Sequence, residues 1–143
     1  MNIIEAIKKY FTQYEMIQSE ANGEIGVDFL KDKGVSFSIE PLPVNPIVKN
    51  YIGSGGERQY AFVLSATFDY SAERQMNVEN SGFFEELQEW IEEQNYKDNL
   101  PQLGEGKEAT KLEVTSNGYL FGISKDMRSG RYQMQFRLLY EVE

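Results

Sequence analysis

Residues 80–96 read Asn-Ser-Gly-Phe-Phe-Glu-Glu-Leu-Gln-Glu-Trp-Ile-Glu-Glu-Gln-Asn-Tyr, a pattern that predicts one amphipathic α-helix. Its large apolar side chains recur at steps of three and four residues and so share one face, formed by Phe83, Leu87, Trp90 and Ile91 with Phe84 at its edge. Asn80 or Ser81 is the predicted N-cap, because its side chain can accept a hydrogen bond from a free amide of the first turn. The apolar face needs a cover, and we expect a β-sheet to supply it.

The opposite face of this predicted helix is acidic and carries Glu85, Glu86, Glu89, Glu92 and Glu93. Glutamates one turn apart repel each other, at roughly 0.2–0.5 kcal/mol per pair. One interpretation is a solvated helix face. The other is that the negative field has a use, either repelling DNA or matching a basic partner.

Length and composition restrict the classes of protein that the chain can belong to. Its 143 residues fit a single domain spanning 1–143. The formal net charge of −9, without a Lys/Arg cluster, argues against free nucleic-acid binding and against an anionic membrane surface. Cysteine and histidine are absent, which excludes disulfides, thiolate nucleophiles, zinc-cysteine sites and Ser-His couples. With no signal-peptide pattern and no long apolar run, we expect a cytosolic protein without a membrane partner.

The remaining regular elements are a second helix and several strands. Apolar residues at helical spacing predict an N-terminal helix over residues 2–18. Alternation, broken only by Leu139, predicts two long strands, 58–70 and 131–142, each with an aromatic-rich buried face. Shorter strand candidates at 25–30 and 35–39 indicate a hairpin.

Two Pro- and Gly-bearing segments, 41–56 and 95–109, are predicted to be long loops. Between the second loop and the last strand, segments 110–116 and 119–124 flank Asn117-Gly118. This dipeptide favours a two-residue hairpin turn, and one strand bent by a bulge is the alternative.

Together these elements predict an α+β fold, a mainly antiparallel sheet packed by two principal helices, one N-terminal and one at residues 81–96. Such a sheet leaves one face of the last strand without helix cover. That polar sheet face carries Arg131, Gln133, Gln135 and Arg137. It suits the lining of a cavity or a subunit contact, and an ordinary wetted sheet surface is the alternative.

Candidate residues for catalysis or metal binding are few. Asp69 with Glu73 could bind a hard cation, but carboxylates are ordinary at a strand end. The glycine-rich segment 53–56 lacks the lysine and the following helix of a P-loop. The second loop holds three acids without the ligand spacing of a calcium loop: Asp98, Glu105 and Glu108. We therefore expect no enzyme, no catalytic residue, no metal and no cofactor.

Several segments in order carry a resemblance to a known family. Besides residues 80–95, they are Asn99-Leu-Pro-Gln-Leu-Gly-Glu-Gly-Lys107, Pro43-Val-Asn-Pro-Ile-Val-Lys49 with Tyr51, Gly118-Tyr-Leu-Phe121 and Arg131-Tyr-Gln-Met-Gln135. From about Pro41 to Tyr140 the chain resembles small tail-completion proteins of Firmicutes siphophages and prophages, often labelled minor capsid proteins. The first forty residues are similar only in having a helix followed by strands.

The resemblance implies a tail terminator-like fold and role. Proteins of that kind form a six-fold ring at the head-proximal end of the tail tube, stop its polymerisation and provide the surface on which a filled head docks. The implied partners are further copies of the chain in a hexameric ring, the tail tube protein, and a head-completion or connector protein. The implied location is the virion tail, assembled in the bacterial host cytoplasm. The acidic surplus would let DNA pass nearby without specific binding.

A ring needs different surfaces for its lateral neighbours, the tube and the head. Long loops suit these contacts, so we predict contact residues in the loops 43–52 and 100–107. They are Pro43, Val44, Pro46, Tyr51, Ile52, Leu100, Pro101, Leu103 and Lys107.

Two other classes of function stay open. A small acidic immunity or antidote protein would use its glutamates to block a basic toxin. A cation-dependent enzyme would need Asp69, Glu73 or the acids of the second loop to converge in one pocket.

Overall fold

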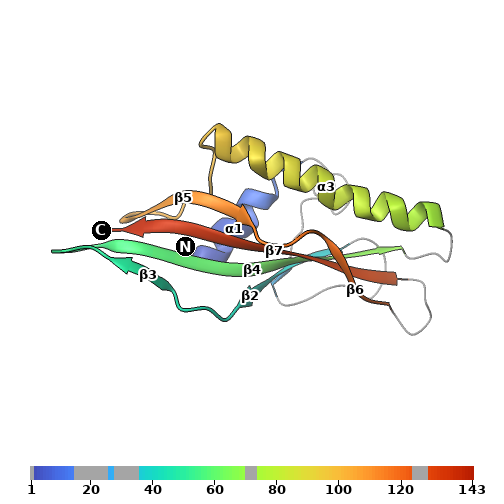
Figure 1. Ribbon diagram of the computed structural model, residues 1–143, viewed down its shortest axis with the longest axis horizontal. Coiled ribbons are helices and arrows are strands. Elements are labelled where there is room, and N and C mark those ends of the chain that lie inside the picture. Colours follow the sequence, from blue (N-terminus) through green and yellow to red (C-terminus); the bar gives the residue numbers. More distant parts are fainter. Residues whose placement is uncertain (1, 15–25, 28–35, 70–73, 124–128) are drawn as a thin grey trace.

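The structure is a computed structural model that describes residues 2–14, 26–27, 36–69, 74–123 and 129–143 (Figure 1). Within these residues the chain has two helices and seven strands, which confirms the predicted α+β fold. In chain order they are α1 (Ile3–Phe11), β1 (Gly26–Val27), β2 (Ser36–Leu42), β3 (Ile47–Asn50), β4 (Gly56–Asp69), α3 (Arg74–Tyr96), β5 (Lys107–Val114), β6 (Tyr119–Ile123) and β7 (Ser129–Val142).

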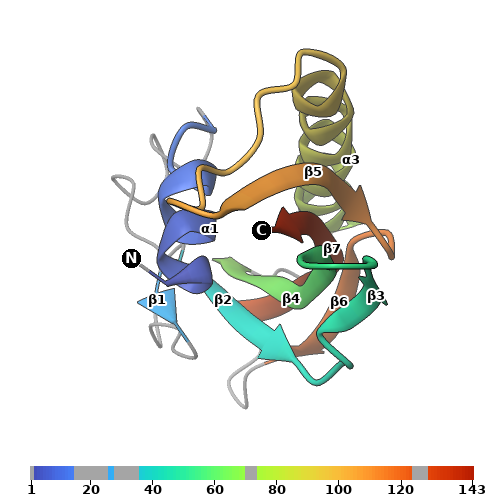
Figure 2. The same cartoon turned by 90° about the vertical axis from the view of Figure 1, so that its left-hand side faces the viewer.

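The sheet is built around β4 and β7, which pair antiparallel from Gly56 opposite Val142 to Asp69 opposite Ser129. Two shorter strands follow one another along each side of this pair. Strands β2 and β3 lie along β4, and β5 and β6 lie along β7, all antiparallel. Both helices cover the same face of the curved sheet (Figures 1 and 2).

Aromatic side chains fill the core between the sheet and the helices. Phe62 of β4 stacks on Phe136 of β7 with ring centroids 5.1 Å apart, and Phe11 of α1 packs edge-on against Phe136 at 5.4 Å. Phe83 of α3 lies 5.2 Å from Phe68 of β4. The predicted apolar helix face is confirmed, with Trp90 half-buried and the others buried: Phe83, Phe84, Leu87 and Ile91.

The helix boundaries differ from the predicted ones. Helix α1 begins after the N-cap Asn2, whose Oδ1 accepts from the Glu5 amide at 2.9 Å, and its last helical residue is Phe11. The predicted continuation beyond residue 14 lies outside the described residues. Helix α3 begins at Arg74, so the predicted N-cap at Asn80 or Ser81 is wrong. Residues 74–79 contain neither Pro nor Gly, so nothing in them stops the helix from extending toward its N-terminus.

The predicted loop 41–56 is also corrected. Strand β2 continues to Leu42, and β3 forms a hairpin with β4. Pro41 is tolerated in β2 because, among the described residues, β1 pairs only with Ser38 and Ile39, so no described strand lies beside the proline on that side of β2. The first two strands do not form a hairpin either, since β1 pairs parallel to β2. Alternation of side chains is the same for both strand directions, so it could not distinguish them.

The hairpin predicted at Asn117-Gly118 is wrong in its pairing. Strands β5 and β6 both pair with β7 and not with each other. The alternative, one strand bent at this point, is closer, because β5 and β6 follow one another along the same side of β7.

Candidate interaction surfaces

The polar sheet face lies on the side of the sheet away from the helices, and its side chains are paired with one another. Arg137 of β7 donates from Nε and Nη2 to Oε2 of Glu113 in β5, at 2.8 and 2.5 Å. Arg131 of β7 reaches across β4 and forms an ion pair with Glu40 of β2. Ser65 of β4 donates to the second carboxylate oxygen of Glu40 at 3.2 Å.

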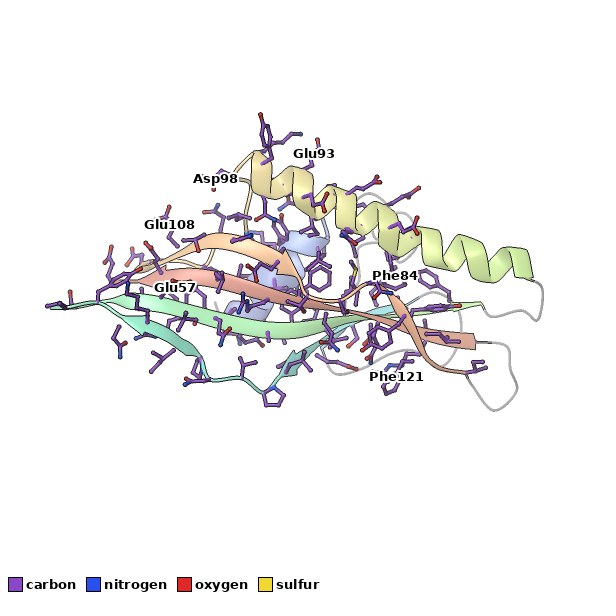
Figure 3. The ribbon with its side chains drawn as sticks, in the orientation of Figure 1. Glu57, Phe84, Glu93, Asp98, Glu108 and Phe121 are labelled. Atoms are coloured by element: carbon purple, nitrogen blue, oxygen red, sulfur yellow. The ribbon has the colours of Figure 1, made fainter. Side chains whose placement is uncertain are left out.

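Strand β6 joins this network through two aromatic residues. Tyr119 donates from its hydroxyl to Oε1 of Gln133 at 3.0 Å and accepts from Nε2 of Gln135 at 3.2 Å. The ring of Phe121 covers the Arg131 guanidinium, with Cζ 5.3 Å from the ring centroid, a cation–π contact. Nε of Arg131 is buried and has no hydrogen-bond partner among the described residues. Figure 3 shows Phe121 on the opposite side of the sheet from α3.

The sheet therefore brings the four predicted residues of this face together, but their charge is largely neutralised. Arg131 and Arg137 each face a glutamate from another strand, and such half-exposed pairs contribute roughly 0.2–1 kcal/mol each. Long side chains also cover the small residues of β4 beneath them, and Ala61, Val63, Ser65 and Thr67 are buried. This network ties the outer strands to β7 and offers little free positive charge to an acidic partner.

The acidic face of α3 is exposed, as predicted, at Glu85, Glu86, Glu89, Glu92 and Glu93. Glu93 pairs with Lys97 one turn later at 2.7 Å and points away from the sheet (Figure 3). The negative charge of this helix face also affects a tyrosine in the core. Burial, together with the charges of Glu86 and Glu89, raises the pKa of Tyr14 to about 12.

The nine predicted contact residues divide into an exposed set and a buried set. The exposed set is Pro43, Val44, Pro46, Tyr51, Ile52 and Lys107. Leu100, Pro101 and Leu103 are instead buried, the two leucines in the hydrophobic core, which leaves little side-chain surface for another subunit. The loop that holds them is fixed to α1, because the Tyr10 hydroxyl donates to the Asn99 carbonyl at 2.9 Å.

The two predicted contact loops reach the same end of the sheet. Gly56, after the β3–β4 turn, and Lys107, at the start of β5, both lie opposite Val142 near the end of β7. Tyr51 in that turn donates to Oε1 of Glu141 at 3.1 Å. The contact role of the exposed residues stays a prediction.

Large exposed apolar side chains of the described residues concentrate on two opposite edges of the sheet. The β3 edge consists of Val44, Ile47, Val48, Tyr51 and Ile52. The β6 edge consists of Leu120, Phe121 and Ile123, which are 43, 61 and 41% exposed. Tyr96, at the end of α3, is exposed but belongs to neither edge.

The three residues of the β6 edge are not among the contact residues predicted from sequence, although Leu120 and Phe121 lie in a segment that carries the family resemblance. The signal was present, because Tyr119-Leu-Phe-Gly-Ile123 has no charged residue and does not alternate between apolar and polar positions. A short strand of that composition is unusual at an exposed edge, where natural proteins place charges or proline.

The edge formed by β5 is closed by a side chain of α3. Nδ2 of Asn95 donates to the Leu112 carbonyl at 2.7 Å, and the Leu112 amide donates to Oδ1 of Asn95 at 3.0 Å. The Asn95 amide thus takes the place of a neighbouring strand at the middle of β5. This contact also docks the last turns of α3 onto the sheet.

The acidic residues considered for cation binding do not form a site in the described part of the chain. Asp98, Glu105 and Glu108 line one open hollow of about 480 Å³ together with Lys107. No group of three or more carboxylates among the described residues is arranged to hold a metal ion. The Asp69 side chain and Glu73 lie outside what the structure describes.

Comparison with known proteins gives little information about this chain. No family model matches it, and neither does any curated protein. One similar solved structure covers 97% of this chain and 94% of its own, with 11% sequence identity and a TM-score of 0.46. That likeness is too distant to carry an argument. Neither helix in the described residues has the length and apolar character needed to cross a membrane.

Proposed function

We propose that the chain is a tail terminator-like structural protein of a phage or prophage, which forms a ring that caps the tail tube and docks the head. The single observation that carries the proposal is the placement of exposed apolar side chains on two opposite edges of one sheet. The resemblance of several sequence segments to tail-completion proteins supports the same role.

Two unlike surfaces on one subunit are what a head-to-tail contact requires. Identical copies joined through unlike surfaces form a closed ring when the rotation between them returns to the start. A two-fold dimer needs one self-complementary surface instead. The β3 and β6 edges differ in length and composition, which favours the head-to-tail arrangement.

The charge of the chain suits a ring through which DNA passes. The net charge of −9 and the exposed glutamates of α3 disfavour contact with phosphates. In the proposed ring these glutamates line or flank the channel, and DNA slides past without binding.

Native mass spectrometry of the chain, and electron microscopy of the chain mixed with purified tail tubes, test this function. We expect a ring and tubes that are capped at one end. The Ile123→Ser variant is expected to lose both, because it removes an apolar side chain from the β6 edge. The matched variant Tyr96→Ser removes an exposed aromatic outside both edges and should retain them. Monomers with uncapped tubes would contradict the proposal.

The exposed acidic face favours one second candidate, an immunity or antidote protein that blocks a basic toxin. The neighbouring gene would then encode a toxin that binds the chain tightly, and added salt would weaken the complex. Replacing Glu85 and Glu89 by Gln should weaken that complex and leave a ring intact. A ring unaffected by these substitutions, with no toxin bound, would contradict this second candidate.

A further inference from the structure

We propose that the β3 edge of one copy pairs with the β6 edge of a second copy, so that the sheet continues from subunit to subunit. This inference rests on the proposed function, because it identifies the lateral contact of the ring. It follows from which strand edges are open, from the direction of the two strands and from their position on the sheet.

Strand β6 has an open outer side among the described residues. Two backbone groups of β3 have side-chain partners that a second strand would replace: the Ile47 amide donates to Oδ1 of Asn45 at 3.0 Å, and Nη1 of Arg58 donates to the Lys49 carbonyl at 3.5 Å. Strand β3 pairs with β4 and strand β6 pairs with β7, and neither has a second neighbour there. The β6 strand carries no charge and no proline, the usual features that prevent an edge from accepting another strand. Strand β5, next to it along the same side of β7, is protected, since Asn95 occupies the backbone groups of Leu112. Along this side of β7, strand β5 is therefore closed to a further strand, whereas strand β6 can accept one.

The strand directions favour an antiparallel contact. Strands β4 and β7 are antiparallel, β3 is antiparallel to β4, and β6 is antiparallel to β7. Within one subunit β3 and β6 therefore run in opposite directions. When the strands of two copies run in the same direction, β3 of one copy can meet β6 of the other only in the antiparallel sense, which is the slightly more stable ladder.

The β3 and β6 edges lie at diagonally opposite corners of the sheet. Glu57, next to β3, is opposite Glu141 of β7, whereas β6 pairs with β7 around Arg131, ten positions earlier. Ten residues of strand correspond to roughly 33 Å. Each copy is thus shifted along the strands relative to its neighbour, and the diagonal of the sheet follows the circumference of the ring.

Cross-linking through introduced cysteines tests this pairing, because the natural chain has no cysteine. The chain with both Val48→Cys and Leu120→Cys is treated with a short bismaleimide and separated under denaturing conditions. We expect a ladder of covalent oligomers, since every subunit joins two neighbours through different edges. Each single variant should stay monomeric, because its cysteine faces no second cysteine, and an equal mixture of the two should stop at dimers. The control chain with Tyr96→Cys and Leu120→Cys should give no ladder.

A second pair of variants checks the contact without cross-linking. Val48→Asp and Ile123→Asp each place a charge on an exposed edge and leave the core unchanged, so circular dichroism should match that of the natural chain. Native mass spectrometry should show each variant shifted from oligomer to monomer.

Absence of a ladder above the control overturns the pairing of β3 with β6. If the natural chain still forms rings that cap tail tubes, the proposed function stands and only this contact is wrong. If the chain gives a ladder but leaves tail tubes uncapped, the contact between β3 and β6 is supported and the proposed tail function is wrong.

Discussion

Gly118 lies against the ring of Phe84, and this contact joins the bend between β5 and β6 to helix α3. A methyl group added at Gly118 would overlap Cγ and Cβ of Phe84, which belongs to the buried core and cannot move freely. We predict that Gly118→Ala lowers the free energy of unfolding by about 1–3 kcal/mol, the usual effect of overpacking. Urea denaturation followed by tryptophan fluorescence measures this change.

Gly82 provides a matched control for that substitution. It lies within α3, and a methyl group there meets no atom within 4 Å. Alanine favours a helix over glycine by roughly 0.8–1 kcal/mol, so Gly82→Ala should raise stability. Equal effects of the two substitutions would contradict the steric role assigned to Gly118.

At the scale of elements, Asn95 connects α3 to β5. Its side-chain amide donates to the Leu112 carbonyl and, at 3.0 Å, to the Ile91 carbonyl of its own helix. The change Asn95→Asp removes the donor and places a negative carboxylate beside both carbonyl oxygens. We predict a loss of about 1–3 kcal/mol in the free energy of unfolding. Hydrogen exchange should show faster exchange of the β5 amides before global unfolding.

Gln88→Glu is the control for the charge that this change adds. Gln88 is exposed on the same helix, and its change to Glu adds one negative charge without removing a contact to β5. Its effect should stay within a few tenths of a kcal/mol. Similar protection of β5 in the Asn95→Asp chain and the natural chain would show that β5 is held by other contacts.

At the scale of the whole molecule, the packing of Tyr10 and Tyr14 against α3 makes stability fall at alkaline pH. Burial raises the pKa of Tyr10, and burial with nearby glutamates raises that of Tyr14 to about 12, whereas an unfolded tyrosine titrates near 10. The unfolded chain therefore loses these protons first. The stabilisation is fully present below pH of about 10 and is lost as pH rises through the folded pKa values.

The alkaline transition can be followed by far-UV circular dichroism as the pH is raised. Tyr14→Phe removes one of the two titrating groups and should move the midpoint of unfolding to higher pH. Tyr96→Phe, at an exposed tyrosine, should leave the midpoint unchanged. A midpoint that is the same in all three chains would exclude Tyr14 as a cause of alkaline unfolding.

The candidate surfaces differ in how well the sequence predicts them. The acidic face of α3 could be predicted because its five glutamates follow helical spacing, a property of residues close in the chain. The pairing of Arg131 with Glu40 could not, since these residues are 91 positions apart and meet only across β4. Likewise, the prolines and glycines of residues 41–56 indicated a loop, but β4 supplies a partner strand for residues 47–50.

Local pattern alone determined the α+β class, the buried faces of β4 and β7, and the apolar face of α3. These features depend on the two-residue period of a strand and the 3.6-residue period of a helix, which can be counted in the sequence itself. Tertiary structure alone decided that β5 and β6 share one side of β7, that Asn95 closes one strand edge, and that apolar side chains stay uncovered on the β3 and β6 edges. The physical reason is that strand order, strand direction and edge exposure depend on contacts between distant residues, and alternation within one strand carries no information about its neighbours.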